Sequence, residues 1–222
     1  MADVPVGKGK SKDTGTINDY RPSWAKKIYK GLPVEPFFLQ AQHPKSSVEP
    51  TRTSVEKMLG AGYLAQRKVN GHRAQIHISA DGRLVAFTRS GTKHTRNFTQ
   101  ATTEHLVTNF KPDKGWTILD AEWQKQEDKV YLFDLLQVGS ELFSNKSFEE
   151  RYTMLRDQFT IGPGVGFLVL LKDVASCLSM LGDPSPFTEG LVWRLVKSPG
   201  FHDSSILRCR KSGVFYEPEK LT

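Results

Sequence analysis

The sequence predicts an α+β domain in which twisted antiparallel sheets are flanked by helices. Apolar and polar residues alternate across residues 63–78, which is the period of a strand with one buried face. Asn70-Gly71 and Asp81-Gly82 separate such runs, and both dipeptides are typical of tight hairpin turns. Residues 102–110 instead show the spacing of an amphipathic helix. Strands and helices therefore share one domain, which we expect over residues 31–222.

Composition indicates a polyanionic partner. The 222 residues carry 31 Lys and Arg against 24 Asp and Glu, a formal net charge of +7. More than half of this excess lies in residues 1–30, which hold seven basic and three acidic side chains and are expected to be disordered. This basic arm is open to two interpretations, a nucleic-acid-binding segment and a solvated tail.

The cysteines and the apolar runs of the sequence indicate the cellular compartment in which the protein works. Cys177 and Cys209 are isolated in the sequence, without metal-ligand spacing or the pattern of a disulfide scaffold. No apolar run approaches the length of a membrane span, and the N-terminus lacks the apolar core of a secretory signal. We therefore expect an intracellular protein in a reducing compartment, cytoplasm or nucleoid, with a viral origin left open.

Lys68 is the first candidate for chemistry. Prolines punctuate an extended segment around residues 33–50, and Ser54–Leu59 is expected to be a short helix capped by Ser54 or Thr53. Lys68 then ends a strand beside the Asn70-Gly71 turn, and Arg73 begins the return strand. A partly desolvated lysine near other cations has a lowered pKa and can act as a nucleophile. The alternative is a solvated lysine in an ordinary hairpin.

Later strands also end in polar residues. The strand from Leu84 ends at Arg89, and Gly91 leaves this arginine room to reach a phosphate or ribose. Trp116–Trp123 places Asp120 and Glu122 on one face, where paired carboxylates suit a metal, a base or hydroxyl ligands. The remaining expected elements are a buried strand at 130–136, a helix from the Ser147/Glu150 capping box to Leu155, a break at Gly162-Pro-Gly164, a buried strand at 167–171, a helix at 174–181 ended by Gly182, and strands at 187–194 and 206–211.

Six segments, in order, resemble the motifs of the covalent nucleotidyltransferases, which include ATP-dependent DNA ligases, RNA ligases and mRNA capping enzymes. Lys68-Val-Asn70-Gly71-His-Arg73 resembles their Lys-x-Asp/Asn-Gly-x-Arg motif. The other five are Thr88–Gly91, Asp120–Glu122 with Ala121 in place of glycine, Val130–Leu136, Glu189–Val192 and Ile206–Lys211. In the last segment Arg208 and Arg210 stand where lysines are usual, unless the register moves to Lys211.

The resemblance implies a nucleotidyltransferase fold of the ATP-grasp-like ligase adenylation type, and a role for each matching residue. Lys68 would be the nucleophile and Glu189 a metal ligand, with Glu122 serving the metal or the ribose hydroxyls. The nucleotide-binding residues would be Gln66 near the base, Arg73 and Arg89 on ribose or phosphate, Phe133 on the adenine face, and Arg208 and Arg210 on the triphosphate.

The implied activity is that of a polynucleotide ligase in DNA repair or replication. It would use ATP and Mg²⁺, with Mn²⁺ possible, to seal nicks in duplex DNA through a lysyl-AMP intermediate, as a monomer. An RNA ligase, a GTP-dependent capping guanylyltransferase and a non-catalytic nucleic-acid-binding module remain open. The family usually continues into an OB-fold domain, which we do not expect in this chain.

Overall fold

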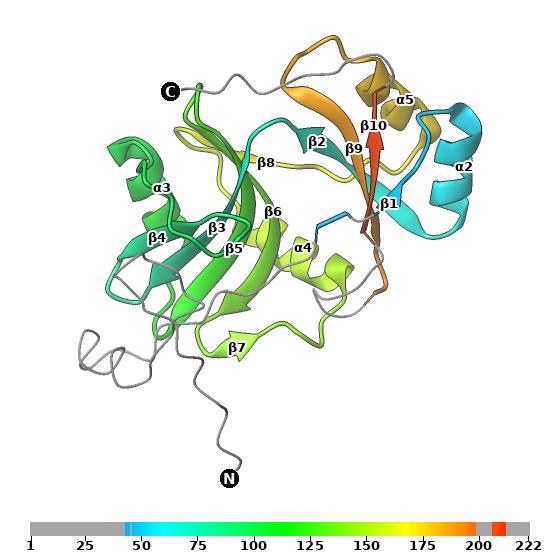
Figure 1. Cartoon of the computed structure of the whole chain (residues 1–222). Helices are drawn as coiled ribbons and strands as arrows, with labels where there is room; N and C mark the ends of the chain where they lie inside the picture. The colour runs from blue at the N-terminus through cyan, green and yellow to red at the C-terminus, as the bar shows by residue number, and fades with distance from the viewer. Residues whose placement is uncertain (1–42, 45, 199–205, 212–222) are drawn as a thin grey trace, which may run out of the picture.

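Two sheets form the framework of the protein (Figure 1). The computed structural model describes residues 43–44, 46–198 and 206–211, so the basic arm at 1–30 and most of the proline-punctuated segment lie outside the described residues. The elements are β1 (Ser46–Ser47), α2 (Arg52–Gly60), β2 (Tyr63–Val69), β3 (His72–Ser79), β4 (Leu84–Phe87), α3 (Gln100–Phe110), β5 (Trp116–Gln124), β6 (Lys129–Val138), β7 (Glu141–Leu142), α4 (Phe148–Gln158), β8 (Val165–Phe167), α5 (Val174–Gly182), β9 (Thr188–Leu195) and β10 (Ile206–Arg210).

The six-stranded sheet is built from strands that follow one another in the sequence, β3 to β8. Its strand order is β4-β3-β5-β6-β7, and β8 pairs with β6 in parallel. Ile76 and Ile78 of β3 pack with Leu106 and Phe110 of α3, because alternate residues of the strand turn their apolar side chains to the helix. Leu155 of α4 joins the same core.

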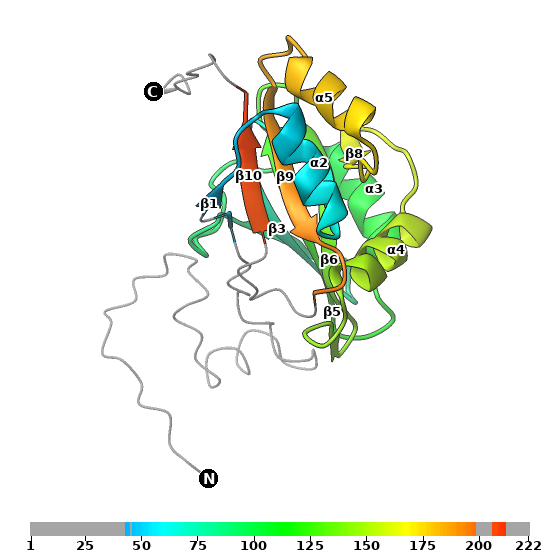
Figure 2. The same cartoon turned by 90° about the vertical axis from the view of Figure 1, so that its right-hand side faces the viewer.

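The four-stranded sheet is built from the two ends of the described chain. Its order is β1-β10-β9-β2, so strands that precede residue 70 pair with strands that follow residue 187. Val55 of α2, Cys177 of α5 and Trp193 of β9 are fully buried in its core. In Figure 2, α2 and α5 lie against this sheet and α3 and α4 beside the other. The α+β class with twisted sheets is confirmed, although the β1–β10 and β6–β8 pairs are parallel.

The expected hairpin at Asn70-Gly71 is wrong. Strand β2 pairs with β9, whereas β3 pairs with β4 and β5, so these two residues carry the chain from one sheet to the other. Neither residue has the positive φ of a hairpin turn. Gly71 is needed for a different reason, since a Cβ there would lie 2.8 Å from the carbonyl oxygen of Trp123. The second turn signal is confirmed, because β3 and β4 form an antiparallel hairpin in which Gly82 has φ +84°.

Three smaller expectations also differ from the structure. Helix α2 is capped by the Thr51 side chain, which accepts from the Ser54 amide, and not by Thr53 or Ser54. The buried strand expected at 167–171 is wrong, because only Phe167 lies in a strand, β8, and Val169 is 59% exposed. Helix α5 runs through Gly182 to a cap at Asp183. The Ser147/Glu150 capping box of α4 is confirmed, as are the strands that carry Lys68, Glu122, Phe133, Glu189 and Arg208.

Candidate active site

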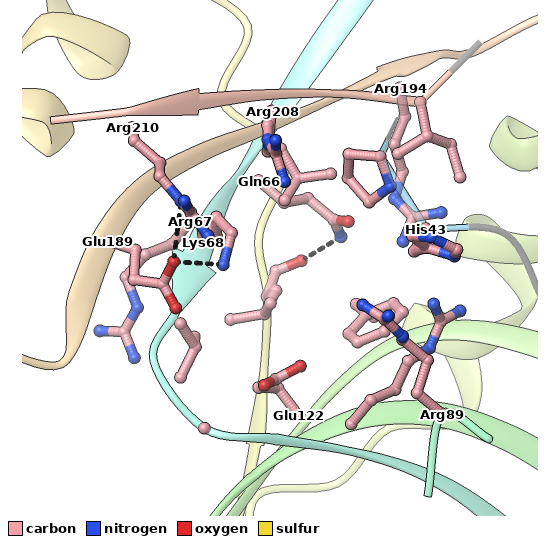
Figure 3. A pocket seen from close by; sticks show the side chains of 18 residues that line it. His43, Gln66, Arg67, Lys68, Arg89, Glu122, Glu189, Arg194, Arg208 and Arg210 are labelled. Atoms are coloured by element: carbon pink, nitrogen blue, oxygen red, sulfur yellow. Dashed lines mark hydrogen bonds and ion pairs between the residues drawn. The ribbon is translucent and has the colours of Figure 1, made fainter. Parts of the chain in front are cut away.

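All nine residues expected in the site line one cleft of about 400 Å³ between the two sheets (Figure 3). They come from segments far apart in the sequence, and the pairing of strands brings them together. The nine are Gln66, Lys68, Arg73, Arg89, Glu122, Phe133, Glu189, Arg208 and Arg210.

One wall of the cleft is the face of β2, β9 and β10. The register of these antiparallel strands sets three rows of directly opposed residues across the wall. The first row is Lys68, Gly190 and Arg210; the second is Gln66, Val192 and Arg208; and the third is Leu64, Arg194 and Ile206. All of these except Leu64 and Gly190 contribute to the lining of the cleft.

Lys68 is held at one end of this wall by a carboxylate. Its Nζ lies 2.5 Å from Oε2 of Glu189, and Nε of Arg210 lies 3.5 Å from the same oxygen. Both Lys68 and Glu189 are partly exposed to the cleft. Glu189 therefore has one negative charge shared between two cations, and a divalent metal ion would have to compete with them.

Arg208 and Arg210, and not Lys211, face the cleft. The Lys211 ammonium donates to the backbone carbonyls of Asp183 and Ser185, at the loop that precedes β9. The register therefore does not slip, and arginines occupy the two positions where the resembling family has lysines.

Glu122 and Arg73 line the other wall of the cleft, which the six-stranded sheet forms. They are directly paired residues of β5 and β3, but Arg73 makes a bidentate ion pair with Asp120, with Nε 2.8 Å from Oδ1. Burial raises the pKa of the Glu122 carboxyl to about 7; Glu189 and Asp120 add to the rise, and Lys68 and Arg73 oppose it. Glu122 therefore changes its protonation state near neutral pH.

Glu122 makes the stability of the protein depend on pH. Since its pKa is higher in the folded chain than its ordinary value of 4.5, the group stabilises the fold below about pH 4.5 and this contribution is lost as the pH rises to about 7. A Glu122→Gln variant, which mimics the neutral acid, should match the wild type at pH 5. At pH 8 it should exceed the wild type by up to about 3 kcal/mol in urea unfolding. An equal difference between the two proteins at both pH values would contradict this assignment.

Gln66 and Phe133 form the middle of the cleft. The Gln66 side chain is buried, and its Nε2 donates to the backbone carbonyl of Leu168 at 3.0 Å (Figure 3). This bond fixes the amide so that its carbonyl oxygen is the acceptor left for a ligand. The Phe133 ring is 8% exposed, with the guanidinium carbons of Arg73 and Arg194 at 5.7 and 5.0 Å from its centroid.

A buried ion-pair network underlies the cleft. Asp134 makes a bidentate pair with Arg151 of α4, at 2.9 and 3.0 Å, and Nη1 of Arg194 lies 3.5 Å from its Oδ2. Asp134 is also directly opposed to Asp120 across β5 and β6. The arginines of the network therefore pair with two buried carboxylates that lie next to each other on neighbouring strands.

Sequence reasoning assigned no site role to the other lining residues, which include His43, Arg67, Val192 and Arg194. An available signal was Arg194 itself, a charged residue that ends the apolar run Leu191-Val-Trp. A charge at such a position either pairs in the core or serves a site.

The donor set in the cleft suits magnesium only in part. Glu189 and Glu122 are its two carboxylates, and in the part of the chain that the structure describes no three His, Cys, Asp or Glu side chains gather as a metal site. Mg²⁺ commonly takes one or two carboxylates and completes its shell with phosphate oxygens and water. The residues present therefore fit a metal ion that arrives with a phosphate ligand.

The described residues also include no helix that is long and apolar enough to cross a membrane.

Comparison with known proteins finds similarity to DNA ligases. A family model described as the ATP dependent DNA ligase domain matches residues 45–129. DNA ligase 1 of Saccharomyces cerevisiae is 25% identical over 165 residues, and the match covers 60% of this chain and 20% of the yeast protein. The chain thus spans about a fifth of the length of this relative.

Solved structures show the same fold. A mycobacterial DNA ligase D complexed with ATP and MES aligns with a TM-score of 0.50 at 17% identity, over 67% of this chain and 54% of that one. A structure named Pmar-Lig_PreS3 aligns with a TM-score of 0.54 at 15% identity, over 85% of this chain and 49% of the other.

Proposed function

We propose that this chain, whose residues 45–129 match the family model of the ATP dependent DNA ligase domain, is a ligase adenylation domain that forms a lysyl-AMP on Lys68 and seals nicks in duplex DNA. The observation that carries the proposal is the single cleft lined by all nine expected residues, with Lys68 at one end. The chain covers only part of its relatives, so the complete activity is our inference from the cleft and the family.

The first step would be nucleophilic attack by Lys68. Its Nζ forms a bond to the α-phosphorus of ATP while the bond to the bridging oxygen breaks and pyrophosphate leaves. Nζ must first lose a proton, and the Glu189 carboxylate 2.5 Å away is the nearest acceptor. Arg208 and Arg210, on β10 beyond β9, would balance the phosphate charge that develops.

Two further steps would complete the sealing reaction. A 5′-phosphate of the nick attacks the phosphoramidate, so AMP passes from Lys68 to DNA. The 3′-hydroxyl then attacks the activated phosphate and AMP leaves. Each step is a phosphoryl transfer, for which positioning and charge neutralisation supply most of the catalysis. When bound with the phosphates, Mg²⁺ held by Glu189 or Glu122 would supply further charge neutralisation.

The orientation of Gln66 favours ATP over GTP. Its free carbonyl oxygen can accept a hydrogen bond from the 6-amino group of adenine. Guanine presents a carbonyl oxygen at the same position, so two acceptors would meet in a buried site. The capping guanylyltransferase alternative is therefore disfavoured by the side chain that the purine would meet.

Incubation with ATP or GTP and a divalent metal tests the proposal. The protein should gain the mass of one AMP with ATP and Mg²⁺, and far less GMP with GTP. An unchanged mass with ATP, in Mg²⁺ and in Mn²⁺, would refute the enzymatic proposal and favour a non-catalytic binding module, which the two arginines at the lysine positions would then explain. Sealing of nicked DNA and nicked RNA, compared side by side, separates the two ligase classes.

A further inference from the structure

We propose that Lys211 is a positioning residue for the adenylylation of Lys68, which it serves by holding Glu189 in place. Its ammonium fastens the loop of residues 183–187 to the end of β10, and Glu189 is the second residue of β9, which follows this loop. The inference rests on the proposed function, in which the Glu189 carboxylate accepts the proton of Lys68. Lys211 does not line the cleft, so it acts on the reaction only through other residues.

Lys211 caps the C-terminal end of α5. Its Nζ donates to the backbone carbonyl of Asp183, which is the C-cap residue of the helix, and to that of Ser185 at 3.3 Å. The last carbonyls of a helix have no partner within it and carry a partial negative charge, which a cation stabilises. The last turn of α5 contains no basic residue of its own. Lys211, which lies just after β10, therefore supplies the positive charge from another element and ties the two elements together.

The loop that Lys211 holds is tied on both sides. The Asp183 carboxylate accepts from the Thr188 hydroxyl at 2.6 Å, which joins the start of the loop to β9. The Asn70 amide, just after β2, donates to the Phe187 carbonyl at 2.9 Å. The backbone of β2 thus holds the end of the loop, and the side chain of Lys211 holds its beginning.

Glu189 itself lies in a β-bulge. Lys68 is paired with Gly190 and the next residue of β2 with Thr188, so Glu189 is an extra residue of β9 without a partner on β2. Its backbone carbonyl instead accepts from the Lys211 amide at 3.0 Å. The place of Glu189 is therefore set by the preceding loop and by Lys211, and not by the ladder that holds Lys68.

The distance between Glu189 and Lys68 is what this arrangement controls. Oε2 of Glu189 lies 2.5 Å from Nζ of Lys68, and a proton acceptor acts only within hydrogen-bond reach. A displacement of about 1 Å is enough to cost much of a catalytic group's effect. Release of the loop would move Glu189 away from Lys68, while Gln66 and Arg208, on β2 and β10, would keep their places. We therefore expect the rate of adenylylation to depend on Lys211 and the affinity for ATP to change little.

A purely structural role makes a different prediction. If Lys211 served only the end of α5, its loss would lower the midpoint of urea unfolding and leave the folded molecules fully active. If it positions Glu189, the loss of rate should vanish once residue 189 can no longer accept a proton. A double-mutant cycle with Glu189→Gln separates the two roles, because the effects of residues that act through one group are not additive.

The test measures the rate at which Lys68 gains AMP in a single turnover, over a range of ATP concentrations in Mg²⁺. Lys211→Met, which keeps the length of the side chain and removes its donors, should lower the maximal rate about tenfold, a part of the effect of a general base. The ATP concentration at half-maximal rate should change by less than about threefold. Lys211→Arg, which keeps charge and donors, should restore most of the rate. In the Glu189→Gln background, Lys211→Met should have no further effect.

Amide hydrogen exchange of the nucleotide-free proteins gives a second measurement, which does not depend on activity. The amides of residues 183–188 and of Asn70 should exchange faster in Lys211→Met than in the wild type, because the loop opens more often. Lys211→Gln, whose shorter side chain cannot hold both carbonyls, provides the same comparison of rate and exchange if the methionine variant does not fold.

Lys197→Met is the matched control, since the Lys197 side chain is 85% exposed, pairs with Glu149 and does not line the cleft. Its rate, its half-maximal ATP concentration and its loop exchange should equal those of the wild type. An unchanged rate or unchanged loop exchange in Lys211→Met, or a tenfold loss that persists in the Glu189→Gln background, would overturn the inference while Lys68 adenylylation stood. Absence of any adduct in the wild type would instead overturn the proposed function.

Discussion

The Lys68→Ala variant is expected to gain no AMP under conditions in which the wild type is fully adenylylated. Lys68 is the lysine paired with Glu189 in the cleft, and an alanine there leaves no nitrogen that could form the phosphoramidate. The side chain is partly exposed and does not belong to the apolar core, so the fold should persist. Intact-mass measurement after incubation with ATP and Mg²⁺ reports the loss directly.

Lys68→Arg is the matched control for this result. Arginine keeps the charge that pairs with Glu189, but its guanidinium stays protonated and is not a nucleophile. Both variants should therefore lack the adduct, and the arginine variant should retain nucleotide binding. An AMP adduct on the alanine variant would place the nucleophile elsewhere in the chain.

Asp134→Ala should destabilise the protein by about 3–5 kcal/mol. The substitution leaves the buried Arg151 without its bidentate partner and removes the only carboxylate within an ion-pair distance of Arg194 among the described residues. It also removes the acceptor for the amide of Leu135. Urea unfolding followed by circular dichroism should show a lower midpoint.

Asp157→Ala is the control for the Asp134 variant. Asp157 also pairs with an arginine, Arg156, but both side chains are more than half exposed, so the loss should stay below about 1 kcal/mol. Similar unfolding midpoints for the two variants would mean that the network beneath the cleft contributes no more than a surface ion pair.

The residues that line the cleft with Lys68 could be proposed from the sequence because the patterns that mark them are local. Lys68 and Glu189 each stand at a strand end next to a glycine-containing segment, and this pattern is visible without the fold. The partners of β2 were not predictable, because nothing near residue 70 encodes a strand that lies more than a hundred residues later. Asn70-Gly71 therefore suggested the wrong neighbour for β2.

Side chains that act through distant partners were missed for the same reason. Arg151 and Arg194 both form ion pairs with Asp134, which is 17 and 60 positions away in the sequence. No local sequence pattern indicates these pairs. The cap of α2 was missed because Thr51, Thr53 and Ser54 are chemically similar, and only the geometry of the first turn selects Thr51.

The six-stranded sheet is inserted, whole, between the strands of the four-stranded one, and this governs when the cleft can assemble. Contacts within the inserted sheet are between near neighbours in the chain, whereas Lys68 meets Glu189 across 121 positions. Closing so long a loop is slow, so we expect the inserted sheet to fold first and the wall that bears the nucleophile to close last. During synthesis, a ribosome-bound chain would hold Lys68 without Glu189, Arg194, Arg208 or Arg210 until β9 and β10 emerge. We therefore expect the growing polypeptide not to react with nucleotides until β9 has paired with β2 and β10 with β9.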